Sequence, residues 1–305
     1  MKKNWILIDQ KIHGNKVACS ADGSLIVIGS QDRLSLLFTN AGQGIDIPVQ
    51  QDISSVACSK DGTTVIAASG REIVIYQAHD NDFKEQMRIS QPQQLRAVTC
   101  TADGSLIIAL AEDGLLTIFD NISDTRTVRQ SITLKGSDGS FDAIRAVACD
   151  DDGSTLAVAT GYFSVRLLKN NGTLWQEAAA IFNINDSLHS ITCTANGSVI
   201  FAGTDAATTL VLTEKDGKLR EVTVLAERSF GLHGTYGACN ANGSIVVSAC
   251  EDGNLRIFEK EGKDWHETAT FTTNSYYCSV ACSDDASVIV AGLGDGTAQM
   301  YRKRN

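Results

Sequence analysis

Cysteine is the residue type whose number and spacing first suggest chemistry in this 305-residue chain. Seven of its nine cysteines recur 39 to 49 residues apart, and each of them follows a short apolar run. Zinc sites draw on closely spaced pairs such as Cys-x-x-Cys, and no such pair occurs. Repeated sheets would face one another about 10 Å apart, whereas a disulfide requires Cα atoms within about 7 Å. We therefore predict reduced, buried cysteines that act as small apolar side chains. They are Cys19, Cys58, Cys100, Cys149, Cys193, Cys239 and Cys282.

Two further cysteines, Cys250 and Cys278, lie off this spacing, near the same edge of neighbouring repeats. A disulfide between them is an open alternative. The N-terminal apolar run Trp5-Ile6-Leu7-Ile8 is too short for the core of a signal peptide. Because no export signal is present, we expect a cytoplasmic protein, and a reducing compartment disfavours the disulfide.

The patterns of nucleophilic and metal-dependent enzymes are missing from the chain. It contains no Gly-x-Ser-x-Gly elbow, no phosphate-binding loop and no His-Glu-x-x-His. Its five histidines fall in different repeats. We predict a protein that is not an enzyme and holds neither a metal nor a cofactor. An active site assembled from several repeats would not show in the spacing, so a catalytic function is kept as the weakest alternative.

Charge and hydropathy exclude two further classes of partner. The formal net charge is −10 and the isoelectric point is near 5.0. Proteins that track nucleic-acid phosphates need a basic surface, so we expect no nucleic-acid partner. No apolar stretch approaches the ~20 residues of a membrane span, so we expect no membrane partner.

The cysteines belong to a sequence repeat that runs through the whole chain. The segment Val17-Ala18-Cys19-Ser20-Ala21-Asp22-Gly23-Ser24 returns with small changes around each of the seven cysteines. Each copy contains an apolar run, a hairpin turn and two more apolar runs; the turn is Asp-Gly or Asn-Gly in six copies and Asp285-Ala286 in the seventh. A fourth, more polar run follows in the copies before the last. A period of about 44 residues with four short strands is typical of propeller blades. The sequence therefore predicts an all-β, seven-bladed β-propeller of four-stranded antiparallel blades.

The last repeat has only three strands before the chain stops, and the chain opens with an unassigned strand at Trp5–Ile8. We predict that this N-terminal strand completes the last blade, because such closure removes two open sheet edges. The expected organisation is one domain over residues 1–305. Its blades are expected at 10–50, 51–91, 92–135, 136–183, 184–228, 229–272, and 273–305 together with 1–9.

These repeats resemble those of the WD-repeat propellers over essentially the whole chain. Val-Ala-Cys-Ser-x-Asp-Gly-Ser stands where that family has a Val-x-Phe-Ser-Pro-Asp-Gly type of segment, although no repeat carries the Trp-Asp dipeptide. The family's structural aspartate in the second turn is matched by Asp32, Asp113, Asp252 and Asp295. The fourth strands that carry Trp175 and Trp265 also resemble FG-GAP repeats, whose calcium-binding loops are absent here.

Alignment of the repeats brings a set of basic side chains to one edge of the ring. The residue just before the inner strand is Arg96, Arg145 and His189 in blades three to five. We expect these side chains on one rim of the central channel. Arginines there could pair with turn carboxylates such as Asp113, or they could anchor a carboxylate of a partner through bidentate contacts.

Aromatic side chains occupy the loops of the same rim, where they could bind a partner or merely cover the blade interiors. Exposed rings beside arginine are typical of binding hot spots. The candidate partner-binding residues are Arg96, Arg145, His189, Tyr162, Phe163, Phe230, His233, Tyr236, Tyr276 and Tyr277.

Repeats that agree in their cores and differ in their rim loops favour an interaction scaffold. We predict a non-catalytic, monomeric scaffold that binds a protein or peptide, with an acidic segment as one option, on the rim. The alternative is a propeller that binds a carbohydrate or another small ligand, followed by an enzyme with its site at the channel mouth.

Overall fold

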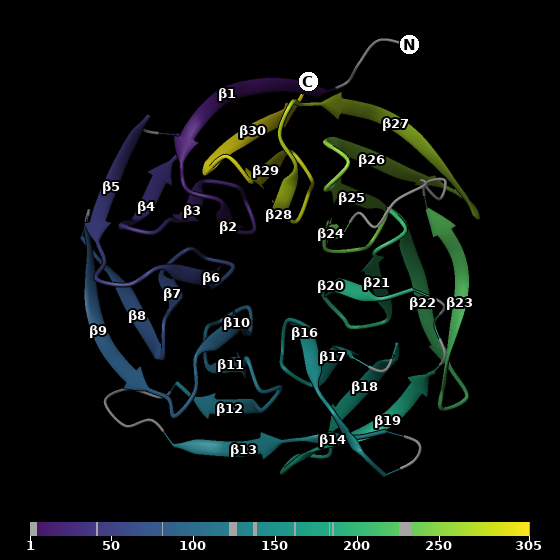
Figure 1. Ribbon diagram of the computed structural model, residues 1–305. Coiled ribbons are helices and arrows are strands. Elements are labelled where there is room, and N and C mark those ends of the chain that lie inside the picture. The colour runs from purple at the N-terminus through teal and green to yellow at the C-terminus, as the bar shows by residue number, and fades with distance from the viewer. Residues whose placement is uncertain are drawn as a thin grey trace.

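A computed structural model describes most of the chain as a ring of small β-sheets around a central channel (Figure 1). The described residues are 5–40, 42–80, 82–121, 127–136, 139–161, 163–182, 184, 186–225 and 234–304. Over these residues the chain forms seven four-stranded antiparallel sheets and no helix. The predicted seven-bladed all-β propeller is confirmed.

The strands of each blade follow one another from the channel outward. Blade one comprises β2 (Lys16–Cys19), β3 (Leu25–Gly29), β4 (Arg33–Phe38) and β5 (Gln43–Pro48). Blade two comprises β6 (Ile53–Cys58), β7 (Thr64–Ser69), β8 (Glu72–His79) and β9 (Asp82–Ser90). Blade three comprises β10 (Leu95–Cys100), β11 (Leu106–Ala111), β12 (Leu116–Asp120) and β13 (Val128–Ile132). A two-stranded hairpin of β14 (Leu134–Lys135) and β15 (Phe141–Asp142) leads into blade four.

Blade four comprises β16 (Ile144–Cys149), β17 (Thr155–Thr160), β18 (Val165–Asn170) and β19 (Trp175–Ile181). Blade five comprises β20 (Leu188–Cys193), β21 (Val199–Thr204), β22 (Thr209–Lys215) and β23 (Lys218–Leu225). Blade six comprises β24 (Thr235–Cys239), β25 (Ile245–Cys250), β26 (Asn254–Glu261) and β27 (Asp264–Thr272). Blade seven comprises β28 (Tyr277–Cys282), β29 (Val288–Leu293), β30 (Thr297–Lys303) and, outermost, β1 (Trp5–His13).

The second strand of most blades is buried on both faces. Every residue of β7, β11, β17, β25 and β29 is buried. Neighbouring blades cover both faces of such a strand, which is why these segments read as continuous apolar runs rather than as alternating ones. The outer strands β5 and β9 are mostly exposed, with partly buried residues at alternate positions toward their C-terminal ends, because only one part of each strand is covered.

The hairpin between the first two strands is held by the repeated polar residues. In blade one, the Leu25 N–H donates to Ser20 Oγ at 3.0 Å, and the Ser24 N–H donates to Asp22 Oδ1 at 2.9 Å. Gly23 has φ of +66°, a left-handed conformation that favours glycine. The hydrogen bonds from Ser24 and Ser20 lower the pKa of the Asp22 carboxyl. The turn chemistry predicted from the Asp-Gly pairs is therefore present.

The seven hairpins are joined to one another by a closed circle of backbone hydrogen bonds. The second residue of each hairpin donates its N–H to the carbonyl of the corresponding residue in the next blade, at 2.7 to 3.0 Å. The last donor returns to the first blade, from Asp284 to Ala21. The members are Ala21, Lys60, Ala102, Asp151, Ala195, Ala241 and Asp284. We call this end of the molecule the hairpin face and the opposite end the rim.

The N-terminal strand closes the ring as predicted. β1 pairs antiparallel with β30, from Trp5 opposite Lys303 to His13 opposite Thr297. The Trp5 side chain is fully buried in the core of blades six and seven. In Figure 1, β1 lies along the outside of β30. Sequence ends that are far apart therefore share one blade.

Candidate functional site

The residues predicted for the rim sit at β-bulges on the inner strands. In β10 and β16, the ladder skips Arg96 and Arg145, each of which is the second residue of its strand. In β20 it skips His189 in the same way. A bulge leaves one residue unpaired and redirects its side chain. Each of these three therefore points away from the blade core, while the residue before it is buried.

Blade six lacks this bulge, and this changes which residue faces outward. There Thr235 pairs with Cys250 and Tyr236 pairs with Ala249 without interruption. Thr235 is fully buried, and Tyr236, the second residue of the strand, occupies a partly buried position at the rim. Burial and the neighbouring Glu251 carboxylate raise the pKa of Tyr236 to about 12.

Arg96 and Arg145 are exposed and form no ion pair with any residue that the structure describes. Asp113, the expected carboxylate partner in blade three, instead accepts a hydrogen bond from the Leu115 N–H at 3.1 Å. The Arg145 guanidinium lies against Gly161, where an added Cβ would come within 3.4 Å of Nε. Both side chains are therefore available to an external carboxylate.

Phe163 is an exposed aromatic residue in the turn that contains Gly161, against which Arg145 lies. It follows Gly161 by two residues and has φ of +54°, a left-handed conformation that is rare for a bulky side chain. Its carbonyl accepts a hydrogen bond from the Ile184 N–H at 2.9 Å. Such strain is found where the surrounding structure holds a residue in place, and it points to function. Tyr162, Phe230 and His233 lie outside the described residues.

His189 is not a free cation, contrary to the expected basic arc over three blades. Its Nε2 contacts Asp205 Oδ1, and its ring meets that of Tyr236 edge-on with centroids 6.3 Å apart. Both partners lie on the same rim, from the second turn of blade five and the first strand of blade six. Of the three basic residues predicted for this rim, Arg96 and Arg145 are thus the two without an ion pair among the described residues.

The two adjacent tyrosines of blade seven differ in burial. Tyr276 is exposed, and its ring lies over Gly294 so closely that a Cβ there would overlap the ring. Tyr277 is fully buried, and its hydroxyl shares a 2.8 Å hydrogen bond with that of Tyr301. The expectation that Tyr277 contacts a partner is wrong, because β28 begins at this residue and turns its side chain into the blade.

An acidic notch of about 510 Å³ lies beside Tyr276, between blades six and seven. The spacing of the repeats did not identify it, because its carboxylates come from turns of different blades. These carboxylates already accept internal hydrogen bonds: Glu251 from the Gly234 N–H, Asp252 from Arg256, and Asp295 from the Thr297 N–H. Carboxylates therefore gather on the rim between blades six and seven, in different blades from Arg96 and Arg145.

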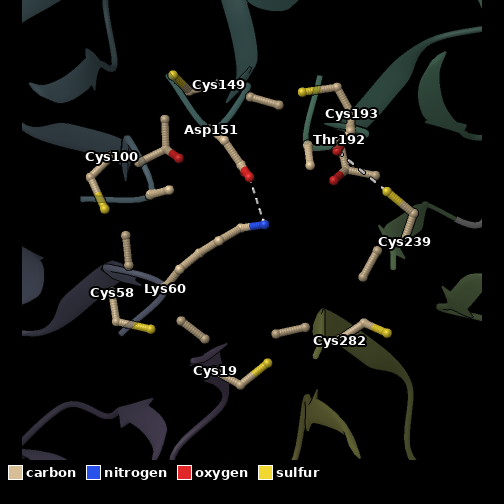
Figure 2. A pocket seen from close by; sticks show the side chains of 18 of the residues that line it. Cys19, Cys58, Lys60, Cys100, Cys149, Asp151, Thr192, Cys193, Cys239 and Cys282 are labelled. Atoms are coloured by element: carbon tan, nitrogen blue, oxygen red, sulfur yellow. Dashed lines mark hydrogen bonds and ion pairs between the residues drawn. The ribbon is translucent and has the colours of Figure 1, made fainter. Parts of the chain in front are cut away.

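The central channel holds a cavity of about 420 Å³ that is bordered by all seven repeat cysteines (Figure 2). Each cysteine packs against a blade core but also keeps some contact with the cavity, so the expected full burial is incomplete. Burial raises the pKa of the thiols, to about 12 for Cys19, Cys100 and Cys239. All nine cysteines, each within the described part of the chain, lack a disulfide, including Cys250 and Cys278. The described residues contain no group of three or more metal-ligating side chains that could hold an ion.

Lys60 crosses the channel at the hairpin face, a role that its place in a turn did not suggest. Its Nζ lies 2.8 Å from Asp151 Oδ2 and 2.6 Å from Asp284 Oδ2. Burial alone would lower the pKa of Lys60, but the hydrogen bonds to the two carboxylates outweigh it and the pKa is raised. One side chain thereby joins blades two, four and seven, as Figure 2 shows for Asp151.

Comparison with known proteins gives a match to the fold and none to a sequence family. Neither a scan against protein-family models nor a search of curated proteins gives a match. Among solved structures, the β-propeller domain of Cps50 (Swd1) from Myceliophteria thermophila matches 99% of this chain and 100% of that chain, with a TM-score of 0.80 and 11% identity. The chain has the fold of a WD-repeat propeller. At this identity the likeness extends to the fold alone. Within the described residues, no helix has the length and apolar character needed to cross a membrane.

Proposed function

We propose that the protein is a non-catalytic scaffold that binds an acidic segment of a partner protein on its rim. Arg96, Arg145 and Phe163 form the centre of contact. The observation that carries the proposal is the place of Arg145. This exposed guanidinium has no ion-pair partner among the described residues and lies against Gly161, two residues from the strained, exposed Phe163.

A free guanidinium suits a carboxylate because it donates two parallel hydrogen bonds in a fixed geometry. An exposed ring beside it adds apolar contact at a low cost in conformational entropy. The net charge of −10 opposes an acidic partner only weakly, because charges farther apart than about 8 Å are screened at physiological ionic strength. The similar propeller of Cps50 supports the fold of such a scaffold and not its partner.

The test uses a random peptide library displayed on phage and selected on the immobilised 305-residue chain. We expect carboxylate-rich peptides to be enriched, and we expect Arg145→Ala to weaken binding of the best peptide by about 5- to 150-fold. This range corresponds to the ~1–3 kcal/mol of a charged hydrogen bond. Arg220→Ala is the matched control, because Arg220 is an exposed arginine of β23 that forms no ion pair with the described residues. Equal losses for the two variants, or peptides without carboxylates, would refute the proposal.

A carbohydrate-binding function is the second candidate, and the notch beside Tyr276 favours it. An exposed ring next to Thr273, Asn274 and Ser275 offers a stacking face together with hydroxyl and amide groups for sugar hydroxyls. A glycan array probed with the same 305-residue chain separates the two candidates. Glycan binding that is lost in Tyr276→Ala and kept in Arg145→Ala would favour the second candidate.

A further inference from the structure

Arg166 of β18 is a buried charge that the proposed function does not use. Its side chain is 4% exposed, and it donates three hydrogen bonds to three different segments. Nη2 donates to Asp142 Oδ2 at 2.6 Å, Nη1 to Glu177 Oε2 at 2.9 Å, and Nε to Ser164 Oγ at 3.3 Å. The residue therefore ties β15, β19 and the turn before β18 together beneath the rim of blade four.

Three exposed phenylalanines lie close to these contacts, two of them in the chain and one in space. Phe141 precedes Asp142, Phe163 precedes Ser164, and the ring of Phe182 lies 5.0 Å from the Arg166 guanidinium. All three lie at the rim end of blade four. β13 ends and β16 begins there, β17 turns into β18 there, and β19 ends there. We call Phe141, Phe163 and Phe182 the blade-four platform.

The charges around the platform are distributed unequally. Arg166 forms ion pairs with the carboxylates of Asp142 and Glu177. Lys135, which pairs with Phe141 in the β14–β15 hairpin, and Arg145 are exposed and form no ion pair with the described residues. Exposed apolar side chains are ordinary when scattered, but a group held by one buried residue marks an interaction surface. The complement to such a surface is a chain segment with large apolar side chains flanked by carboxylates.

We infer that the blade-four platform docks an acidic partner segment through its large apolar side chains, and that Arg166 is the positioning residue that holds the platform. The inference rests on the proposed function, because it specifies the partner class for the same rim. It extends the contact outward from Arg145 to Phe141 and Phe182, which a purely electrostatic anchor would not need. Rings buried at an interface of this kind carry much of its binding energy.

The peptides selected on the wild-type chain distinguish the inference from the proposed function. Enrichment of carboxylates together with Leu, Phe, Ile or Trp supports the platform. Enrichment of carboxylates without large apolar residues overturns the platform and leaves the proposed function standing. Peptides without carboxylates overturn both.

Affinities of the best selected peptide then test the residues. We expect Phe182→Ala to weaken binding by about tenfold or more, the scale of a hot spot. Leu174→Ala is the matched control, because Leu174 and Phe182 are both 43% exposed and Leu174 lies in the turn at the hairpin face of the same blade. Unchanged affinity for Phe182→Ala, with a loss for Arg145→Ala, would overturn the platform alone.

The role of Arg166 is tested with the double variant Arg166→Met/Asp142→Asn, which removes both charges of the buried pair. In this background we expect Phe182→Ala to weaken binding by less than about threefold, because a ring that Arg166 no longer positions already contributes little to the affinity for the peptide. A merely structural role would leave the tenfold effect of Phe182→Ala in place, and that result would overturn the positioning role. A melting curve confirms that the double variant is folded. If it is not, Ser164→Ala removes one of the three contacts, and the same comparison decides.

Discussion

Replacement of Lys60 by Met should lower the free energy of unfolding by about 2 kcal/mol. The side chain of Lys60 is 29% exposed, and those of Asp151 and Asp284 are each 38% exposed. Fully exposed ion pairs contribute ~0.2–1 kcal/mol each, and breaking a fully buried pair costs ~3–5 kcal/mol. Two half-buried pairs that share one ammonium group fall between these limits.

The loss includes a repulsion that the lysine now masks. Both carboxylate oxygens lie within 2.8 Å of the same nitrogen, so they are less than about 6 Å apart. Without the ammonium group, the two negative charges repel each other across the channel mouth. We therefore expect Asp151→Asn together with Asp284→Asn to restore part of the stability lost in Lys60→Met. Added salt should reduce the difference in unfolding free energy between wild type and Lys60→Met, because salt screens the exposed part of the ion pairs.

The assay is urea denaturation followed by intrinsic fluorescence, with Lys84→Met as control. Lys84 is an exposed lysine of β9 without an ion pair among the described residues, so its replacement should change stability by no more than about 0.5 kcal/mol. The pKa of Lys60 is raised, so its charge persists up to and beyond the usual lysine value of about 10.4. The effect of Lys60→Met should consequently be the same at pH 7 and pH 9. Equal stability of Lys60→Met and wild type would refute a role for the bridge.

Three further perturbations test the fold. Deletion of residues 1–9 removes most of β1, including the buried Trp5, so the melting temperature should fall sharply; an unchanged melting temperature would contradict closure by this strand. The seven repeat cysteines should react slowly with iodoacetamide at pH 7.5, because burial raises the pKa of their thiols, and mass spectrometry showing rapid labelling of them without denaturant would contradict their packing. Hydrogen bonds lower the pKa of the Asp103 carboxyl although burial opposes them, so this group stabilises the fold above pH ~4 and the contribution is lost as the pH falls through the lowered pKa. Asp103→Asn keeps the acceptor without the titration, and it should flatten the decline of the unfolding free energy between pH 5 and pH 2; the same decline in both proteins would contradict the assignment.

Repeated local chemistry made the fold predictable from the sequence. The hairpin of each blade depends on neighbouring residues, such as the Ser20 hydroxyl, the Asp22 carboxylate and the left-handed Gly23, and these recur as a visible pattern. The number of blades follows from the count of such patterns. The closing strand followed from one missing strand at the end of the chain and one surplus strand at its start.

The sequence predicted where the rim residues lie, but not which residues they contact or how exposed they are. Alignment of the repeats placed Arg96, Arg145 and His189 at one end of the inner strands, and they lie at that end in the structure. It could not show that Asp205 contacts His189, because that carboxylate comes from another turn of the blade. It also could not show that Tyr276 is exposed and Tyr277 buried, because only the tertiary structure shows that β28 begins at Tyr277 and that the blade core covers this side chain.

The sequence by itself determined the all-β class, the seven repeats, their hairpins and the strand that closes the ring, because each depends on local residue types or on their period. Only the tertiary structure decided which charges meet. Lys60 contacts carboxylates of two other blades, and Arg166 joins segments that the chain separates by a strand or more. The physical reason is that ring closure brings Lys60 and its two carboxylates together across the channel, and the packing of blade four against its preceding hairpin brings together the partners of Arg166. Spacing in the chain encodes neither proximity.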